Sequence, residues 1–349
     1  MSSHQVTRDQ VMTALGRVVD PELGRDLVSL GMIDNLEIEG SRVSFTINLT
    51  TPACPMASEI RQDALAAVQA LDGVTDVEIE MGSRVPFGQK KSKHEGIRNV
   101  VAVASGKGGV GKSTVAVNIA VSLAQKGARV GLLDADIYGP NILTMMGVKA
   151  LGGTRDEKII PGEGHGVKVM SMAFLVKPEQ ALIWRGPMLH SAIKQFISDV
   201  DWGELDYLIV DLPPGTGDVQ LSLAQTLELQ GGVIVTLPQQ VSLDDALRGI
   251  NMFQELDIPL LGVVENMSYL KTPDGEEIDI FGSGGGERLA EMTNIPYIGS
   301  IPIDPQVRKG GDQGVPVVVS HPEAAVSQAL DSVAERIAAQ VSIKALTDS

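Results

Sequence analysis

The sequence predicts an α/β protein in which a doubly wound, mostly parallel sheet is preceded by a small α+β domain. Three observations support this prediction. After residue 98, short apolar runs alternate with amphipathic segments of helical spacing, which is typical of a sheet covered by helices on both faces. A glycine-rich loop follows the first of these runs. Before it, a separate stretch has the order α-β-β-α-β and ends in a basic segment.

Length and composition indicate two globular domains and argue against non-specific binding to nucleic acid or membranes. The chain has 349 residues, of which 43% are hydrophobic and 21% are charged, and its net charge is −16. Such an acidic chain lacks the basic surface that non-specific binding to nucleic acid or anionic lipid requires. The single cysteine excludes an intrachain disulfide, and the first ten residues are too polar for a signal peptide. We therefore expect a cytoplasmic protein with no nucleic-acid partner and no membrane partner.

The first domain, residues 1–82, is predicted from its hydrophobic periodicity. Helix, strand, strand, helix and strand are expected at 7–19, 33–38, 42–49, 56–71 and 74–80. A basic linker at 83–97 follows, with Lys90, Lys91 and Lys93 in an otherwise acidic chain. Two interpretations of this linker stay open: an exposed hinge, or a docking site for an acidic partner.

The second domain, residues 98–349, contains the strands of the predicted parallel sheet. Most are continuous apolar runs, as expected for strands that are buried on both faces. The expected strands are 98–104, 129–134, 167–172, 206–211, 231–237, 259–265 and 297–301. A ligand of such a sheet binds at the carboxyl ends of the strands.

Residues 105–114, SGKGGVGKST, form a phosphate-binding loop between the first of these strands and a helix at 113–126. Glycines let backbone N–H groups approach phosphate oxygens without a Cβ in the way, and the helix N-terminus adds the positive end of its dipole. Lys112 is placed to bridge the β- and γ-phosphates, and the Ser113 hydroxyl to hold Mg²⁺. The residues expected to contact ATP here are Gly106, Gly108, Gly109, Val110, Gly111, Lys112, Ser113 and Thr114.

Lys107 is a second lysine within this loop, and the nucleotide of its own chain does not need it. In a face-to-face dimer its ammonium could reach the partner's γ-phosphate and neutralise charge in the transition state, as an arginine finger does. The alternative is a solvated surface lysine. We treat Lys107 as a candidate catalytic residue, together with Lys112.

Carboxylates end two further strands of the same sheet. Asp134 ends the strand at 129–134, where it can hydrogen-bond a magnesium-bound water, and Asp136 follows in the loop, where it can orient the attacking water. Asp211 ends the strand at 206–211 and is the expected partner of Mg²⁺ through water. Each aspartate alone could instead cap a helix or shape a turn. We expect Asp136 and Asp211 to serve catalysis and Asp134 and Asp211 to serve the metal.

The adenine base is expected to lie beside two later segments. Asn266 ends the strand at 259–265, and its amide could read the edge of adenine through a paired donor and acceptor. Pro302 and Asp304 follow the last strand and could close over the base, with Asp304 reaching an exocyclic amine. A plain loop is the alternative for both segments.

These motifs resemble a known family. KGGVGKST, DADIYGPN, VDLPPGTGD and ENMS resemble the MinD/ParA-like branch of P-loop ATPases, and IWRGPM and IFGSGGG add a resemblance to iron–sulfur cluster carrier ATPases of the Mrp/ApbC type. The resemblance covers residues 98 to 340. DPELGRDLVSLG at 20–31 and TTPACPM at 50–56 resemble the small domain of iron–sulfur assembly factors. Family membership implies an ATP-hydrolysing homodimer that binds a 4Fe–4S cluster between protomers and delivers it to apoprotein clients.

The sequence departs from this family at the cluster ligands. Carriers of this type follow ENMSY with a Cys-x-x-Cys pair, whereas here Thr272 stands at the first position and the segment is one residue short at the second. The one thiol is Cys54, two residues before the helix at 56–71. A helix N-terminus lowers the pKa of a thiol, so Cys54 is a candidate iron ligand; the alternative is a small buried apolar residue.

Two functions therefore stay open at the level of the sequence. The first is ATP-dependent transfer of an iron–sulfur cluster to apoproteins or between assembly factors. The second is an ATP-dependent scaffold or adaptor of the MinD/ParA kind that carries no cluster. Membrane-sorting relatives of that kind end in a basic amphipathic helix. The final helix here, expected at 323–343, has an apolar stripe but an outer face of mixed charge, and we expect the stripe to pack in the core.

Overall fold

A computed structural model describes residues 6–88, 96–137, 139–174, 186–272 and 274–347. The described chain divides into two compact units, residues 1–86 and 87–349. Residues 89–95 of the predicted basic linker, which include its three lysines, and the IWR of the IWRGPM motif lie outside the described residues.

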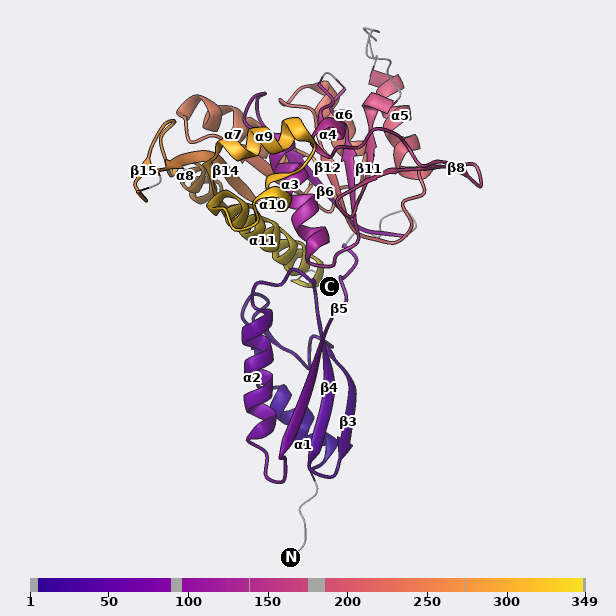
Figure 1. The fold of residues 1–349 in the computed structure, drawn as a ribbon, viewed down its shortest axis with the longest axis vertical. Helices are drawn as coiled ribbons and strands as arrows, with labels where there is room; N and C mark the ends of the chain where they lie inside the picture. The colour runs from indigo at the N-terminus through magenta and orange to yellow at the C-terminus, as the bar shows by residue number, and fades with distance from the viewer. Residues whose placement is uncertain (1–5, 89–95, 138, 175–185, 273, 348–349) are drawn as a thin grey trace, which may run out of the picture. The chain divides into compact units, whose positions relative to one another are not determined.

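The smaller unit is a three-stranded sheet packed against two helices (Figure 1). Strands β3 and β4 pair antiparallel, and β4 and β5 pair parallel. The alternating side chains Val43, Phe45 and Ile47 of β4 are buried with Ile60 and Val68 of α2 in a single core. The elements are α1 Arg8–Leu15, β1 Val19–Asp20, β2 Arg25–Asp26, β3 Ile33–Glu39, β4 Arg42–Leu49, α2 Ala57–Gln69 and β5 Asp76–Ser83.

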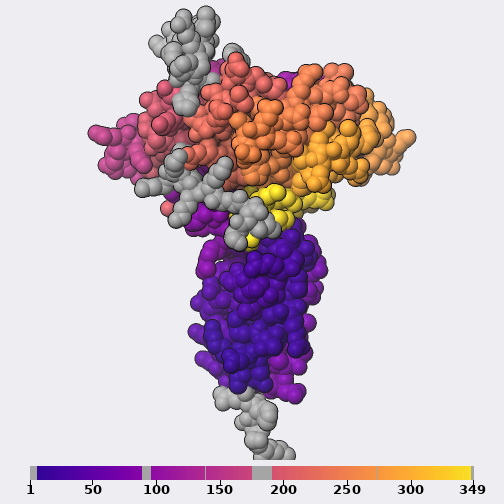
Figure 2. Space-filling model, turned by 180° about the vertical axis from the view of Figure 1, so that it is seen from behind, coloured from indigo at the N-terminus to yellow at the C-terminus, as the bar shows by residue number. Residues whose placement is uncertain are grey.

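The larger unit is built on a nine-stranded sheet in the order β10-β11-β7-β12-β6-β13-β14, with β15 and β16 both paired to β14. All pairs are parallel except those of β10 and β15. On the surface in Figure 2 the pink segments around β11 lie on one side of this unit and the orange segments around β14 on the other, as the strand order requires. The strands are β6 Ile97–Ala104, β7 Val130–Asp134, β10 Gly162–Gly164, β11 Val167–Ser171, β12 Leu205–Asp211, β13 Gly231–Thr236, β14 Leu260–Lys271, β15 Glu277–Ile278 and β16 Tyr297–Ile303.

Helices cover both faces of this sheet. Val100 and Ala102 of β6 join a core that includes residues of α5 to α8, and the alternating neighbours Val101 and Val103, also buried, point to the opposite face. Helices α3 and α11 pack on each other, and α3 also contacts β6, β7 and β12. The helices are α3 Lys112–Gln125, α4 Ile142–Met145, α5 Gly186–Ser198, α6 Asp218–Thr226, α7 Gln240–Glu255, α8 Gly285–Thr293, α9 Pro305–Gln313, α10 Val317–Ser320 and α11 Ala325–Thr347.

The C-terminal helix packs as expected. The apolar stripe of α11, including Val326, Leu330 and Val333, is at most 2% exposed, so it belongs to the core. Within the described part of the chain, no helix is both long enough and apolar enough to cross a membrane.

The doubly wound α/β fold predicted from the sequence is confirmed, and its seven expected strands lie within a few residues of β6, β7, β11, β12, β13, β14 and β16. The sequence did not predict six short strands: β1 and β2 of the smaller unit, β10 and β15 of the larger unit, and a hairpin formed by β8 Gly153–Arg155 and β9 Lys158–Ile160. β14 also continues to Lys271, well past its expected end at residue 265. β8, β9 and β15 are exposed or only partly buried, and their two or three residues are too few to form the apolar runs that mark the central strands.

Candidate nucleotide site

The phosphate loop joins the end of β6 to the start of α3 at the carboxyl edge of the sheet. Gly109 and Gly111 have φ angles of 83° and 82°, a left-handed conformation that glycine adopts without a steric penalty. Gly111 is the residue before α3, and no side chain caps its helix. The first N–H groups of α3 therefore lack a side-chain acceptor and are available to an anion.

Two glycines of the loop are also required by close packing. A Cβ on Gly106 would lie 2.1 Å from the carbonyl of Asp245 in α7, and a Cβ on Gly111 would lie 2.2 Å from Nδ2 of Asn266. The loop is thus held between α7 on one side and the end of β14 on the other.

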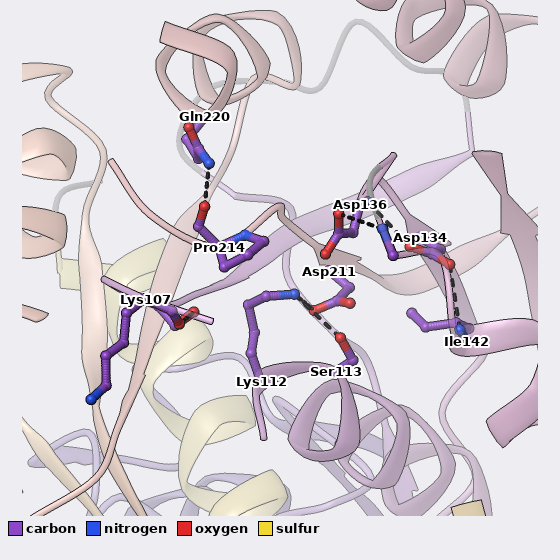
Figure 3. Close-up of polar contacts among 11 residues, drawn as sticks. Lys107, Lys112, Ser113, Asp134, Asp136, Ile142, Asp211, Pro214 and Gln220 are labelled. Atoms are coloured by element: carbon purple, nitrogen blue, oxygen red, sulfur yellow. Dashed lines mark hydrogen bonds and ion pairs between the residues drawn. The ribbon is translucent and has the colours of Figure 1, made fainter. Parts of the chain in front are cut away.

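Lys112 and Asp211 form a buried ion pair at the centre of the site (Figure 3). The Nζ–Oδ1 distance is 2.5 Å, and the side chains are 5% and 1% exposed. Burial raises the pKa of Asp211, and the adjacent ammonium of Lys112 counteracts this rise. Nζ of Lys112 also donates to the Ser113 hydroxyl at 3.3 Å. The second oxygen of Asp211, Oδ2, is buried and accepts no hydrogen bond from the described residues.

Asp134 and Asp136 lie beside this pair (Figure 3). Asp134 accepts hydrogen bonds from the Ser171 hydroxyl at 2.9 Å and from the N–H of Asp136 at 3.1 Å. Burial, and secondarily the charge of Asp211, raises the pKa of Asp134 to about 7. Asp136 is 8% exposed and accepts the N–H of Gly139 at 3.3 Å. The three aspartates predicted at this edge of the sheet are therefore brought together around the lysine.

Lys107 is placed differently from Lys112. Its side chain extends away from Lys112 and the aspartates (Figure 3), so it does not face the phosphate site of its own chain. The neighbouring loop after β12 is held by hydrogen bonds from the N–H of Gly215 to the carbonyl of Ser105 at 2.9 Å and from Gln220 to the carbonyl of Pro214 at 2.5 Å.

A pocket of about 560 Å³ adjoins the phosphate loop at Gly111 and Thr114. It contains all three residues expected at the base, Asn266, Pro302 and Asp304. Nδ2 of Asn266 donates to the carbonyl of Val110 at 2.8 Å. One N–H of the amide is therefore engaged by the loop, and the paired donor and acceptor toward the base stay a prediction. Oδ1 of Asp304 accepts the N–H of Gln306 and caps α9, which leaves Oδ2 to reach a ligand.

Part of the pocket wall was missed by the sequence reading. α4 contributes Thr144 and Met145, and α9 contributes Arg308 and Asp312. Ser171, the hydroxyl partner of Asp134, was also missed. α4 has only four residues, which is too short for periodicity. α9 contains two consecutive glycines, and only its ends, Asp304-Pro305 and Gly314, provide a sequence signal for a helix.

Cys54 lies in the smaller unit, and its environment differs from the one expected. The side chain is partly buried, and its thiol donates to Glu22 at 3.8 Å. Burial, together with the carboxylates of Glu22 and Asp20, raises the pKa of Cys54 to about 12, although a backbone hydrogen bond from Met56 opposes the rise. The expectation of a lowered pKa was wrong, because burial and two acidic neighbours outweigh the helix N-terminus. Within the described residues, no three or more His, Cys, Asp or Glu side chains are grouped to hold a metal ion.

Comparison with known protein families decides the assignment. A family model described as an NUBPL iron-transfer P-loop NTPase matches residues 96–338. The chain belongs to this NUBPL iron-transfer P-loop NTPase family. A second model, described as an iron–sulfur cluster assembly protein, matches residues 8–81. Both resemblances drawn from the sequence motifs are confirmed.

Named relatives of this NUBPL-family chain span nearly its full length. An iron–sulfur cluster carrier protein of Deinococcus radiodurans is 54% identical, covering 97% of each chain. One of Synechocystis is 52% identical, covering 98% of this chain and 99% of the relative.

Solved structures confirm the fold of the larger unit. A nucleotide-binding protein of Archaeoglobus fulgidus in complex with ADP is 39% identical, with a TM-score of 0.56, and the match covers 66% of this chain and 90% of that one. The cell-division ATPase MinD of Pyrococcus furiosus is 25% identical, with a TM-score of 0.53, and the match covers 68% of this chain and 98% of that one.

Proposed function

We propose that the chain binds ATP with Mg²⁺ and hydrolyses the bond between the β- and γ-phosphates. The observation that carries this proposal is the buried Lys112–Asp211 pair, which lies beside uncapped helix N–H groups and a pocket large enough for a nucleoside. A buried ammonium without solvent contact is costly, and a triphosphate would provide it with several further acceptors. The Archaeoglobus fulgidus relative is described in complex with ADP, which supports nucleotide binding by this fold.

The polar groups around Lys112 fit Mg²⁺ held mainly by hydroxyl, phosphate and water oxygens. Ser113 would provide a direct ligand, and Asp134 and Asp211 would contact the ion through water. The buried Oδ2 of Asp211, with no donor among the described residues, is an acceptor suited to such a water. Mg²⁺ neutralises phosphate charge when bound. Such a Mg²⁺ ion needs one protein hydroxyl as a direct ligand and no group of three carboxylates, so it is compatible with the described residues, which contain no such group.

Hydrolysis is assigned to three side chains. Asp136, almost fully buried beside the pair, holds and orients the attacking water. Lys112 stabilises the charge that develops on the phosphate oxygens. Lys107, which extends away from its own site, completes the site of a second copy in a face-to-face homodimer. Asn266, Pro302 and Asp304 are assigned to the base, with Asn266 offering its acceptor to an exocyclic amine.

The cargo proposed for this ATPase is an iron–sulfur cluster, which it transfers to apoprotein clients or exchanges with assembly factors. The relatives of Deinococcus radiodurans and Synechocystis are named as cluster carriers, and the smaller unit matches an assembly-protein family. Cys54 is the sole thiol of each chain, so a dimer offers two thiolates. A 4Fe–4S cluster would need the rest of its ligands from a partner protein or a small thiol.

Iron analysis tests this cargo. The protein is purified without air, and iron and acid-labile sulfide are measured per chain in the wild type and in Cys54→Ser. We expect near-equal iron and sulfide in the wild type and a clear loss in the variant. If neither protein retains iron or sulfide, and reconstitution yields no cluster absorbance, the chain is the ATP-dependent adaptor or scaffold instead. Equal loading of both proteins would remove Cys54 from the ligand set.

A further inference from the structure

Glu265 is a buried carboxylate that the proposed reaction does not use. It lies on β14, is 0% exposed, and accepts hydrogen bonds from the backbone N–H groups of Gly284 at 3.1 Å and Gly286 at 2.6 Å. The Ser268 hydroxyl donates to it as well. A buried charge is stable only when such donors satisfy it. Since Gly285 is the first residue of α8, the charge also lies at the positive end of a helix dipole.

Two glycines at the start of α8 leave no room for a side chain. A Cβ on Gly286 would lie 2.9 Å from Cβ of Glu265, and a Cβ on Gly285 would lie 2.4 Å from the carbonyl of Pro238. Gly284 has a φ of 69°. The start of α8 is therefore fitted closely to β14, and Glu265 fixes where it lies.

The next residue of β14 binds the phosphate loop. Consecutive side chains of a strand point to opposite faces, and the Asn266 amide donates to the Val110 carbonyl at 2.8 Å. Two neighbouring residues of one strand thus hold the phosphate loop on one face and the start of α8 on the other.

β14 is irregular at this position. Met267 has a φ of 54° although it is not glycine, and the register against β16 shifts between Asn266 and Leu270. Such bulges and strained residues re-aim side chains near functional sites. The strand then forms a hairpin with β15, residues 268–283, in which residues 274–283 are exposed, and the chain continues into α8 at Gly284.

We propose that Glu265 is a positioning residue that couples nucleotide occupancy of the phosphate loop to the placement of the 268–283 hairpin. The inference rests on the proposed binding of ATP. A phosphate that draws Val110 and Gly111 inward displaces Asn266, and the adjoining Glu265 carries that displacement to the N–H groups of Gly284 and Gly286. The hairpin bears the exposed apolar side chains Ile278, Ile280 and Phe281, so this coupling places an apolar surface under nucleotide control.

Hydrogen exchange with and without a non-hydrolysable ATP analogue and Mg²⁺ tests the coupling. In the wild type, we expect the analogue to change exchange within 268–287. In Glu265→Gln the amide NH₂ faces one of the two backbone donors, so exchange at Gly284 or Gly286 should be about 10- to 100-fold faster. The response of the hairpin to the analogue should then be lost, although calorimetry still detects nucleotide binding.

Glu287→Gln is the matched control. Glu287 is exposed in the first turn of the same helix, so its loss removes the same charge without breaking the contacts to Gly284 and Gly286. This variant should keep the wild-type response. If Glu265→Gln fails to fold, Ser268→Ala removes a single donor and should weaken the response in the same direction.

Two results would overturn the coupling, and a third concerns ATP itself. The role of Glu265 is contradicted if the analogue changes hydrogen exchange in the hairpin of Glu265→Gln as much as in the wild type. The same holds for Ser268→Ala where that variant is used. Coupling itself is contradicted if the wild type binds the analogue but hydrogen exchange in its hairpin does not change. If calorimetry shows that the wild type binds no analogue, the proposed function fails, and the coupling falls with it.

Discussion

At the scale of single residues, the site depends on two buried, opposite charges, each of which is stable only beside the other. Lys112 and Asp211 are both almost fully buried, and removal of one partner from such a pair strands the other charge in a low dielectric. The same burial that makes the pair sensitive to substitution prepares Lys112 for a polyanionic ligand.

Asp211→Asn should therefore lower the free energy of unfolding of the larger unit by roughly 3–5 kcal/mol without nucleotide. Adding Lys112→Met removes the stranded ammonium and should recover much of that loss. Urea unfolding followed by tryptophan fluorescence measures both variants, because both tryptophans, at positions 184 and 202, belong to the larger unit. Losses that simply add in the double variant would show that the two groups do not interact.

The thiol of Cys54 gives a second prediction at this scale. A rise of its pKa from 9.0 to about 12 leaves about a thousandfold less thiolate near neutral pH. Because a raised pKa keeps the proton bound, alkylation of the folded chain by iodoacetamide should be slow and should still increase with pH beyond pH 9. The urea-unfolded chain provides the reference rate. A rate that reaches its plateau at or below pH 9 in the folded protein would contradict the raised pKa.

At the scale of elements, the phosphate loop uses its glycines for two physical reasons. Gly109 needs its left-handed φ and has open space where a Cβ would stand, whereas Gly106 meets the backbone of α7. Backbone atoms cannot move aside as a flexible side chain can. The packing of Gly106 against α7 therefore restrains the loop as well as the left-handed conformation of Gly109 does.

Gly106→Ala should consequently cost about 1–3 kcal/mol of stability. Gly109→Asn, which tolerates a left-handed backbone, should cost less in the same assay. Urea unfolding without nucleotide compares them, so that effects on phosphate binding do not enter. A Gly106→Ala protein as stable as the wild type would mean that α7 does not pack against the loop as described.

The elements also show what sequence reasoning can and cannot reach. Continuous apolar runs mark β6, β12 and β13 because both of their faces are buried, and glycine spacing marks the phosphate loop. The spacing of residues along the chain does not predict the burial of a single side chain or its contacts with residues far away in the sequence. The acidic neighbour of Cys54 lies 32 residues away, and the amide of Asn266 is oriented by a carbonyl 156 residues away.

At the scale of the whole molecule, the chain has two compact units, and the residues of the proposed functions are divided between them. The larger unit contains every residue assigned to ATP, and the smaller unit contains the single thiol. In the proposed homodimer, Lys107 links the nucleotide sites of the two chains, because its side chain extends away from its own site.

Lys107→Ala should therefore spare ATP binding but reduce turnover by about 10³- to 10⁵-fold, the contribution of a charge supplied in trans. Steady-state phosphate release measures turnover, and mixing Lys107→Ala with a Lys112→Ala partner provides the control for a shared site. Equal loss of ATP binding and turnover in Lys107→Ala would contradict the role across the dimer.

Calorimetric titration with ATP and Mg²⁺ tests the central claim most directly. The account predicts saturable binding in the wild type and in Lys107→Ala, and none in Lys112→Ala, because Lys112 lies at the centre of the phosphate site. A wild-type protein that takes up no nucleotide, or a Lys112→Ala variant that binds as tightly as the wild type, would contradict it.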